Sequence, residues 1–188
     1  MHAIAISSSP RERSNTDLLL RRCLDSLAKH GVTGELVTLR GKTIKGCRAC
    51  EICRKNKDKR CNTRDDDFHP IFEAMLEADI IVVGSPVYFG SATALVKGLL
   101  ERAGYANRGA FSGKVGGPIV VARRAGKNFT FAELNFWFHI SGMINPGSTY
   151  WNVGIGREPG QVEQDEEGMR TVWNFGKNIA RVVKALGE

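Results

Sequence analysis

Short apolar runs alternate with longer amphipathic segments along the chain, and this alternation restricts the fold more than any other feature. The runs are nearly continuous and rich in isoleucine and valine, which is typical of strands buried on both faces. They span residues 2–7, 32–39, 78–84 and 115–122, with a less regular run at 143–153. Apolar residues at helical spacing occupy the segments 16–30, 67–77, 92–103, 131–141 and 161–186.

Five alternations of strand and helix predict a parallel sheet with helices on both faces. Right-handed crossovers and a length of 188 residues favour one domain, residues 1–188, with the strand order 2-1-3-4-5. In such a sheet, ligands bind beyond the carboxyl ends of the strands, where the order reverses. The loops at residues 7–16, 85–91 and 122–128 are therefore the candidate binding loops.

The composition excludes several classes of protein. An apolar content of 42% is too high for a disordered chain. No apolar run reaches the roughly 18 residues that a membrane span needs. The N-terminal residues 1–6 enter the first apolar run without a basic signal region. We expect a cytoplasmic protein with no membrane partner.

The basic residues are concentrated in one short stretch. Nine Lys and Arg stand against two acidic residues between positions 40 and 60, which accounts for the whole net charge of +7. Proteins that coat nucleic acid usually spread such residues along a helix or sheet face. Four of the five cysteines lie in the same stretch. The basic stretch therefore indicates a site, and we expect no nucleic-acid partner.

The loop after the first strand has the composition of a phosphate site. It reads Ser-Ser-Ser-Pro-Arg-Glu-Arg-Ser-Asn-Thr over residues 7–16 and opens into a helix. Hydroxyls, guanidinium groups and the free N–H groups of a helix N-terminus suit a phosphate dianion. A capping box of Ser14 and Asp17 is the simpler alternative, and it explains fewer of these residues. The triphosphate and dinucleotide glycine motifs do not fit the sequence, so a mononucleotide is the predicted ligand.

The loop after the third strand, residues 84–91, carries two adjacent aromatic residues, Tyr88 and Phe89, and then Gly90. A flat heterocycle needs an aromatic wall and a close approach of the backbone, which glycine permits. Alternatively, the two aromatic residues belong to the core or to an interface, and Ser91 caps the next helix.

Together, Ser-Pro-Arg-x-x-Ser-Asn-Thr at 9–16 and Gly-Ser-Pro-Val-Tyr-Phe-Gly at 84–90 resemble the NADPH-dependent FMN reductase family over essentially the whole chain. The resemblance implies a flavodoxin-like three-layer sandwich. In the family, the first loop holds the FMN phosphate, and the matching residues are Ser9, Arg11, Ser14, Asn15 and Thr16. The next loop wraps the isoalloxazine and matches Pro86, Val87, Tyr88, Phe89 and Gly90. A third loop lies along the ring and matches Ala122, Arg123, Arg124 and Gly126.

Four cysteines form a C-x2-C-x2-C-x7-C pattern at Cys47, Cys50, Cys53 and Cys61. This spacing lets one loop, an insertion at about residues 44–66, wrap an inorganic cluster, and we expect a four-iron, four-sulfur cluster. Zinc is the second candidate, although its knuckles are usually farther apart. Disulfides are disfavoured in a cytosolic protein. The pattern also resembles that of the iron–sulfur flavoproteins, a branch of the same family.

These features predict an oxidoreductase that binds FMN without covalent attachment and passes electrons between the cluster, FMN and an external partner. NAD(P)H or a small redox protein would donate electrons, and a small molecule would accept them. The apolar helix 131–141 and the family resemblance suggest a homo-oligomer, a dimer or a tetramer. The alternatives are an NAD(P)H-dependent FMN or quinone reductase without a cluster, and a zinc-stabilised binding module.

Four further residues carry local predictions. Cys23 lies on the apolar side of the first helix and is expected to be a buried thiol. Asp67 is expected to cap the helix that follows it. Thr130 and Glu133 are expected to form a capping box at the start of the helix 131–141.

Overall fold

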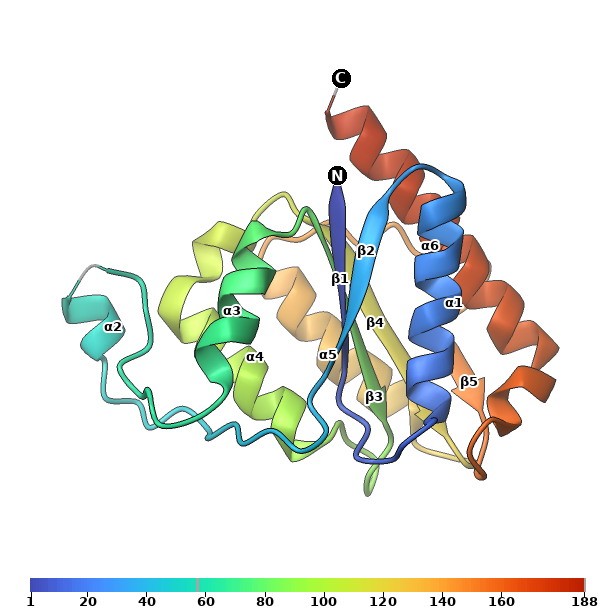
Figure 1. Ribbon diagram of the computed structural model, residues 1–188, viewed down its shortest axis with the longest axis horizontal. Coiled ribbons are helices and arrows are strands. Elements are labelled where there is room, and N and C mark those ends of the chain that lie inside the picture. Colours follow the sequence, from blue (N-terminus) through green and yellow to red (C-terminus); the bar gives the residue numbers. More distant parts are fainter. Residues whose placement is uncertain (57, 188) are drawn as a thin grey trace.

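A computed structural model describes residues 1–56 and 58–187. Five parallel strands form one sheet in the order β2-β1-β3-β4-β5 (Figure 1). The strands are β1 (His2–Ser7), β2 (Thr33–Thr38), β3 (Ile80–Pro86), β4 (Val115–Ala122) and β5 (Val153–Ile155). This arrangement confirms the predicted class and order. β1, β3 and β4 are almost wholly buried, as their continuous apolar runs indicated.

Helices cover both faces of the sheet (Figure 1). One face is covered by α1 (Asn15–Lys29) and α6 (Glu166–Leu186), and the other by α3 (Phe68–Glu77), α4 (Ala94–Asn107) and α5 (Lys127–Ile140). Each face has its own apolar core, so the sheet is sandwiched between two layers of buried side chains. A short helix, α2 (Ile52–Lys55), and two 3-10 turns, η1 (Arg108–Phe111) and η2 (Gln161–Gln164), complete the chain. None of the described helices is long and apolar enough to cross a bilayer.

The last strand differs from its prediction. Most of the segment 143–153 is irregular, and only Ile144 makes an isolated bridge, to Val115. Pro146 has no N–H to donate, and Gly147 has a left-handed conformation with φ 65°, so the chain turns there. Pairing with β4 resumes only at Val153–Ile155.

One predicted helix cap was wrong, and a second is confirmed in its position but not in its hydrogen bond. α5 begins before Thr130, directly after Gly126, whose φ of 86° is left-handed. The Glu133 carboxylate therefore lies in the second turn, where it accepts a hydrogen bond from the Ala92 N–H at 2.9 Å. Asp67 is the N-cap residue of α3, as predicted, but its carboxylate accepts from the Thr43 N–H at 2.7 Å and makes no capping hydrogen bond.

Two other local predictions were confirmed. Ser14 is the N-cap of α1, and its hydroxyl accepts from the Asp17 N–H at 3.0 Å. Cys23 is 1% exposed in the core beneath α1 and α6. Burial raises the pKa of its thiol to about 12, so Cys23 is an inert core residue.

Candidate functional site

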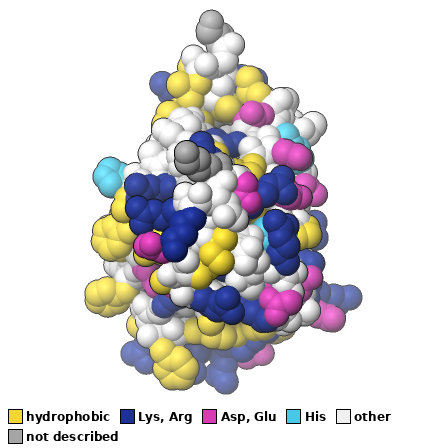
Figure 2. All heavy atoms as spheres, turned by 90° about the vertical axis from the view of Figure 1, so that its left-hand side faces the viewer, with side chains coloured by type: hydrophobic (Ala, Val, Ile, Leu, Met, Phe, Trp, Pro, Cys, Tyr) yellow, Lys and Arg dark blue, Asp and Glu magenta, His cyan; other side chains and the backbone are white. Residues whose placement is uncertain are grey.

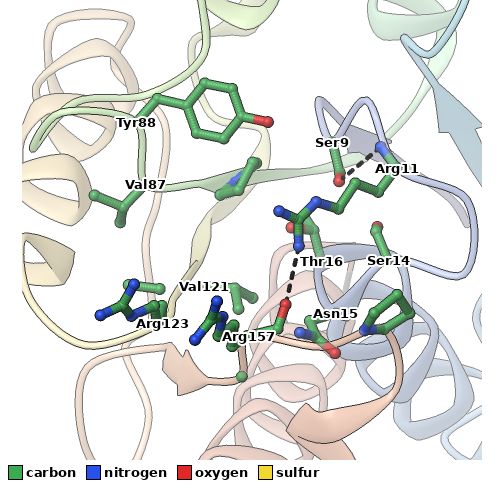
Figure 3. Close-up of a pocket in the computed structure, with 14 residues that line it drawn as sticks. Ser9, Arg11, Ser14, Asn15, Thr16, Val87, Tyr88, Val121, Arg123 and Arg157 are labelled. Carbon is green, nitrogen blue, oxygen red and sulfur yellow. Dashed lines mark hydrogen bonds between the residues drawn. The ribbon is translucent and has the colours of Figure 1, made fainter.

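A cavity of about 310 Å³ opens at the carboxyl edge of the sheet, among the loops that follow β1, β3, β4 and β5 (Figure 3). It brings together residues of the three predicted loops. From these loops it is lined by Ser9, Arg11, Ser14, Asn15, Thr16, Pro86, Val87, Tyr88, Ala122 and Arg123, with Val121 of β4 between them. Among the residues that the structure describes, three arginines and no carboxylate line the cavity, since Arg157 joins Arg11 and Arg123. This excess of positive charge suits an anionic ligand.

The loop after β1 is fixed by its serines. The Ser7 hydroxyl donates to the Asp17 carboxylate, and the Ser8 hydroxyl donates to the Gly84 carbonyl at 3.1 Å. These bonds hold the loop against β3 and against the first turn of α1. Asp17 and Leu18 donate their N–H groups to Ser14, but the helix offers no acceptor to those of Asn15 and Thr16. This end of the cavity therefore presents hydroxyls and free N–H donors.

A fourth loop, after β5, completes the cavity and was missed by the sequence reasoning. It contributes Gly156, Arg157 and Pro159 to the lining. The Asn15 side chain ties this loop to α1, donating to the Glu158 carbonyl at 3.0 Å and accepting from the Val162 N–H at 3.2 Å. The available signal was Gly154-Ile155-Gly156, but its use depended on placing β5 correctly.

Arg11 also reaches the loop after β5. Its guanidinium donates to the Arg157 carbonyl at 2.9 Å, so it crosses the cavity beside Ser9 and Thr16 (Figure 3). Arg40 in turn donates to the Arg11 carbonyl and pairs with Asp17. Hydrogen bonds thus hold the cationic end of the cavity before any ligand enters.

The loop after β3 forms a tight turn. Tyr88 and Ser91 exchange two backbone hydrogen bonds, of 2.9 and 3.0 Å. Between them, Phe89 has φ 52° and Gly90 has φ 80°, as a two-residue turn of this kind requires. Tyr88 and Val87 face the cavity (Figure 3), whereas Phe89 projects fully into solvent and Gly90 lies outside the lining.

The loop after β4 packs against this turn. A Cβ added at Gly126 would lie 2.9 Å from Val87 Cγ1 and 3.2 Å from Gly90 Cα, so the two loops touch where Gly126 has no side chain. Arg123 lines the cavity, whereas Arg124 is exposed and, like Gly126, lies outside the lining. Some of the predicted ring-binding residues therefore line the cavity, and others lie in the same loops outside the lining. The first group is Pro86, Val87, Tyr88, Ala122 and Arg123, and the second is Phe89, Gly90, Arg124 and Gly126.

Glu133 holds the turn from α5. Its carboxylate accepts from the Ser91 hydroxyl at 2.9 Å and from the Ala92 N–H at 2.9 Å, and Lys97 Nζ lies 3.2 Å away. Burial opposes ionisation of Glu133, but these hydrogen bonds and the ammonium outweigh it, and its pKa is lowered. The sequence pattern does not show this role, because it depends on the packing of α5 against α4.

All four predicted cysteines line a second, smaller cavity of about 110 Å³, away from the sheet and beside α4. The Cys53 thiol lies 3.5 Å from the Tyr105 carbonyl. The Cys47 N–H lies 3.4 Å from the Glu101 carboxylate. Burial, followed by the neighbouring thiols of Cys61 and Cys50, raises the pKa of Cys53.

The donor chemistry of the two cavities can be compared with the groups that the sequence predicted. Hydroxyls, helix N–H groups and a guanidinium at one end of the larger cavity, with Tyr88 and Val87 opposite, fit FMN. Four thiols around one small cavity fit an iron–sulfur cluster or zinc in donor type. Among residues 1–56 and 58–187, however, no three metal-binding side chains are arranged to hold a metal ion.

Comparison with known proteins agrees with the fold and with the larger cavity. The family model described as NADPH-dependent FMN reductase matches residues 1–158. An iron–sulfur flavoprotein of Methanocaldococcus jannaschii is 36% identical over 99% of both chains. Another, of Methanosarcina thermophila, is 32% identical over 99% of this chain and 97% of its own.

A WrbA-like flavodoxin from Agrobacterium tumefaciens has the same fold. Its TM-score is 0.69 at 14% identity, and the match covers 98% of each chain. The arrangement of layers is therefore that of the flavodoxins, while the sequence relatives are named iron-sulfur flavoproteins. Taken with the cavity, these matches show that the chain belongs to the NADPH-dependent FMN reductase family, in its iron–sulfur flavoprotein branch, and is a flavin oxidoreductase.

Proposed function

We propose that this protein binds FMN in the 310 Å³ cavity and passes electrons between FMN, a four-iron, four-sulfur cluster at Cys47, Cys50, Cys53 and Cys61, and an external partner. One observation carries the proposal. Two cavities with different donor chemistry, one of hydroxyls and N–H groups and one of thiols, lie in one domain. Full-length relatives named iron-sulfur flavoproteins support the pairing of these two groups.

In this proposal, the larger cavity binds the flavin through groups that are already oriented. The phosphate receives hydrogen bonds from the hydroxyls of Ser9, Ser14 and Thr16. The α1 N-terminus adds N–H donors, and Arg11 adds a positive charge. Pro86, Val87 and Tyr88 form the wall against the ring and exclude water from one of its faces. Bound FMN supplies one- and two-electron redox chemistry, so the protein sets position and electrostatics.

The cysteine cavity contributes the second redox site. Thiolates are the ligands that iron–sulfur clusters use, and a bound cluster supplies one-electron transfer. The four cysteines are half-buried or exposed, so they are accessible to cluster assembly. Arg102 lines the same cavity, and its charged side chain is buried.

The surface around the cysteines suggests the donor. Arg48, Arg54, Lys55 and Lys59 are exposed on this segment, and Figure 2 shows Lys and Arg side chains gathered on that face. Such a surface favours an acidic small redox protein through electrostatic steering. NAD(P)H is the other proposed donor, and a small molecule that reaches the flavin beside Tyr88 is the proposed acceptor.

The exposed face of α5 supports a homo-oligomer, a dimer or a tetramer. Phe136 is 71% exposed and Ile140 is 64% exposed, and Phe129, two turns before Phe136 on the same helix face, is 78% exposed. Large apolar side chains in a row on a helix are unusual at a free surface and typical of an interface. Glu133 lies one turn after Phe129 and one turn before Phe136, so an oligomer formed through this stripe would lie next to the helix that holds the turn at residues 88–91 (the flavin turn).

The arrangement of the thiols favours a second candidate function. Since no described ligand set is arranged around one point, a reductase that uses NAD(P)H to reduce FMN or a quinone without a cluster is the alternative. It predicts rapid NADPH oxidation by protein that contains FMN and no iron.

One anaerobic purification separates the two candidates. Flavin, iron, sulfide and zinc are assayed on the same sample, before and after cluster reconstitution. About one FMN with four iron and four sulfide per chain supports the electron-transfer proposal. FMN without iron after reconstitution contradicts it and supports the plain reductase.

A further inference from the structure

Arg102 is a buried charge in α4, far along that helix from the flavin turn. Its side chain is 1% exposed, and it pairs with the carboxylate of Asp66, which is 0% exposed. Arginine is almost never fully buried without a partner, because desolvating a guanidinium is costly. The pair places a cation next to the cysteine cavity, which Arg102 also lines.

The guanidinium connects the two ends of the cysteine-rich segment. One terminal nitrogen donates to the Lys45 carbonyl at 3.3 Å, before the first cysteine, and the other donates to the Thr63 carbonyl at 2.9 Å, after the last. The guanidinium carbon also lies 3.9 Å from the centre of the Phe68 ring. These contacts, with Asp66, already satisfy the structural needs of a buried arginine.

One further contact is not needed for that structural role. Arg102 Nε lies 3.3 Å from Cys61 Sγ and donates to it. A neutral thiol is a weak acceptor, whereas a thiolate accepts such a bond strongly. The contact is therefore of most value when Cys61 carries negative charge, as it does when it binds a metal.

We propose that Arg102 is a positioning residue for the cysteine site, which orients Cys61 through the Nε–Sγ hydrogen bond and offsets the charge of its sulfur. The inference rests on the proposed metal-binding function of this cavity. Residues that hydrogen-bond to a ligand atom fix its direction and typically change metal affinity 10- to 100-fold. A donor to a cluster sulfur also favours the reduced state, because it stabilises added negative charge.

The test uses two variants of the full chain. Arg102→Lys keeps the charge and removes the planar fork. Arg102→Gln combined with Asp66→Asn removes the charge without leaving a buried carboxylate unpaired. FMN content and thermal unfolding verify that each variant folds, since the flavin cavity lies at the other end of α4. Arg60→Gln is the matched control, because Arg60 adjoins Cys61 in sequence but pairs with Glu73 at 2.8 Å.

Two readouts are measured, and neither is enzyme activity. The first is the affinity of the cluster-free protein for Co²⁺ alone, followed by the absorption of thiolate-bound cobalt. The second is the midpoint potential of the reconstituted cluster. We expect the double variant to bind Co²⁺ about 10- to 100-fold more weakly and to have a lower midpoint potential. Arg102→Lys should have a Co²⁺ affinity and a midpoint potential between those of the double variant and the wild type. Arg60→Gln should resemble the wild type in both quantities.

Wild-type values in both Arg102 variants would overturn the inference. A loss of the same size in Arg60→Gln would also overturn it, because charge anywhere on the segment would then suffice. Failure of the wild type to assemble a cluster would instead contradict the proposed function. Weaker Co²⁺ binding in the variants would still support the role of Arg102 in that case.

Discussion

The flavin cavity and the cysteine cavity are built in different ways. The first lies where four strands end, so each of the loops that line it is anchored at the edge of the sheet. The second lies on a segment whose described residues, 44–56 and 58–66, form no strand and one helix, the four-residue α2. Ala49, Glu51 and Lys59 of this segment have left-handed backbones, with φ of 50°, 57° and 55°. Non-glycine residues adopt that region at some energetic cost, so side-chain contacts must hold them there.

The flavin cavity therefore follows from the fold, whereas the shape of the cysteine cavity depends on a few side chains. Asp66 accepts from the Lys45 N–H at 2.9 Å, and Arg102 joins both ends of the segment. Changes in the cysteine segment should therefore leave the flavin cavity intact. Five predictions test this separation.

The largest expected effect comes from replacing Cys47, Cys50, Cys53 and Cys61 with serine together. All bound iron and sulfide should be lost, because hydroxyls do not replace thiolates as cluster ligands. FMN content should stay at the wild-type level, since none of the four lines the flavin cavity. Metal and flavin assays on one sample measure both. Simultaneous loss of FMN would show that the two sites are not independent.

Gly126→Val should weaken FMN binding about 10- to 100-fold, which corresponds to the roughly 1–3 kcal/mol of a strained left-handed residue. The new side chain would also press on Val87 and Gly90. Fluorescence titration of the flavin-free protein with FMN gives the affinity. Gly147→Val is the control, because Gly147 has φ 65° but no atom within 4 Å of an added Cβ. Equal losses in the two variants would argue against contact between the loops.

Ser14→Ala should lower the free energy of unfolding by about 1 kcal/mol, because α1 loses its N-cap. It should also weaken FMN binding, since the same hydroxyl lines the cavity. Urea unfolding measures the first effect, and FMN titration measures the second. Thr93→Ala serves as a control, because Thr93 is an N-cap whose side chain makes no capping bond. A loss as large in Thr93→Ala would contradict the assignment.

Glu133→Gln should change how stability depends on pH. The lowered pKa of Glu133 means that its carboxylate stabilises the fold above the ordinary value of 4.5. That contribution is lost as the pH falls through the lowered pKa. The stability difference between wild type and Glu133→Gln should therefore be full near pH 7 and shrink in acid. Urea unfolding from pH 3 to 7 measures it, and a constant difference would contradict the prediction.

The smallest effect concerns Cys23. Because burial raises the pKa of its thiol to about 12, iodoacetamide should not modify it in the folded protein. The four cysteines of the second cavity should react in the metal-free protein. Mass mapping after alkylation distinguishes the five sites. Modification of Cys23 at a similar rate would show that the core beneath α1 opens readily.

Most of the sheet could be predicted because buried parallel strands leave a direct mark on the sequence. The apolar runs of β1, β3 and β4 are continuous, and β4 has the bounds that the sequence predicted. β5 could not be placed, because its three residues are fewer than the roughly four to eight over which a strand pattern can be recognised. Pro146 and Gly147 interrupt the apolar run before it.

The residues of the two cavities also differ in whether the sequence alone indicates their role. Hydroxyl-rich and aromatic loops were visible because their composition is unusual for a turn. The contributions of Arg157, Glu133 and Arg102 were not visible, because each depends on a partner far away in the sequence. Helix faces and loop contacts of this kind are set by tertiary packing, which periodicity does not report.

α4 has a consequence for the spacing of the two sites. It starts after the flavin turn at Ser91, and Arg102 lies nine residues beyond Thr93, or about 14 Å along the axis. The number of residues in α4 between Thr93 and Arg102 therefore sets the distance between the two cavities. Inserting one residue before Arg102 would rotate it by about 100° away from Cys61, whereas inserting a whole turn would keep its direction and add about 5.4 Å. The separation of the two cavities thus depends on the length and phase of one helix.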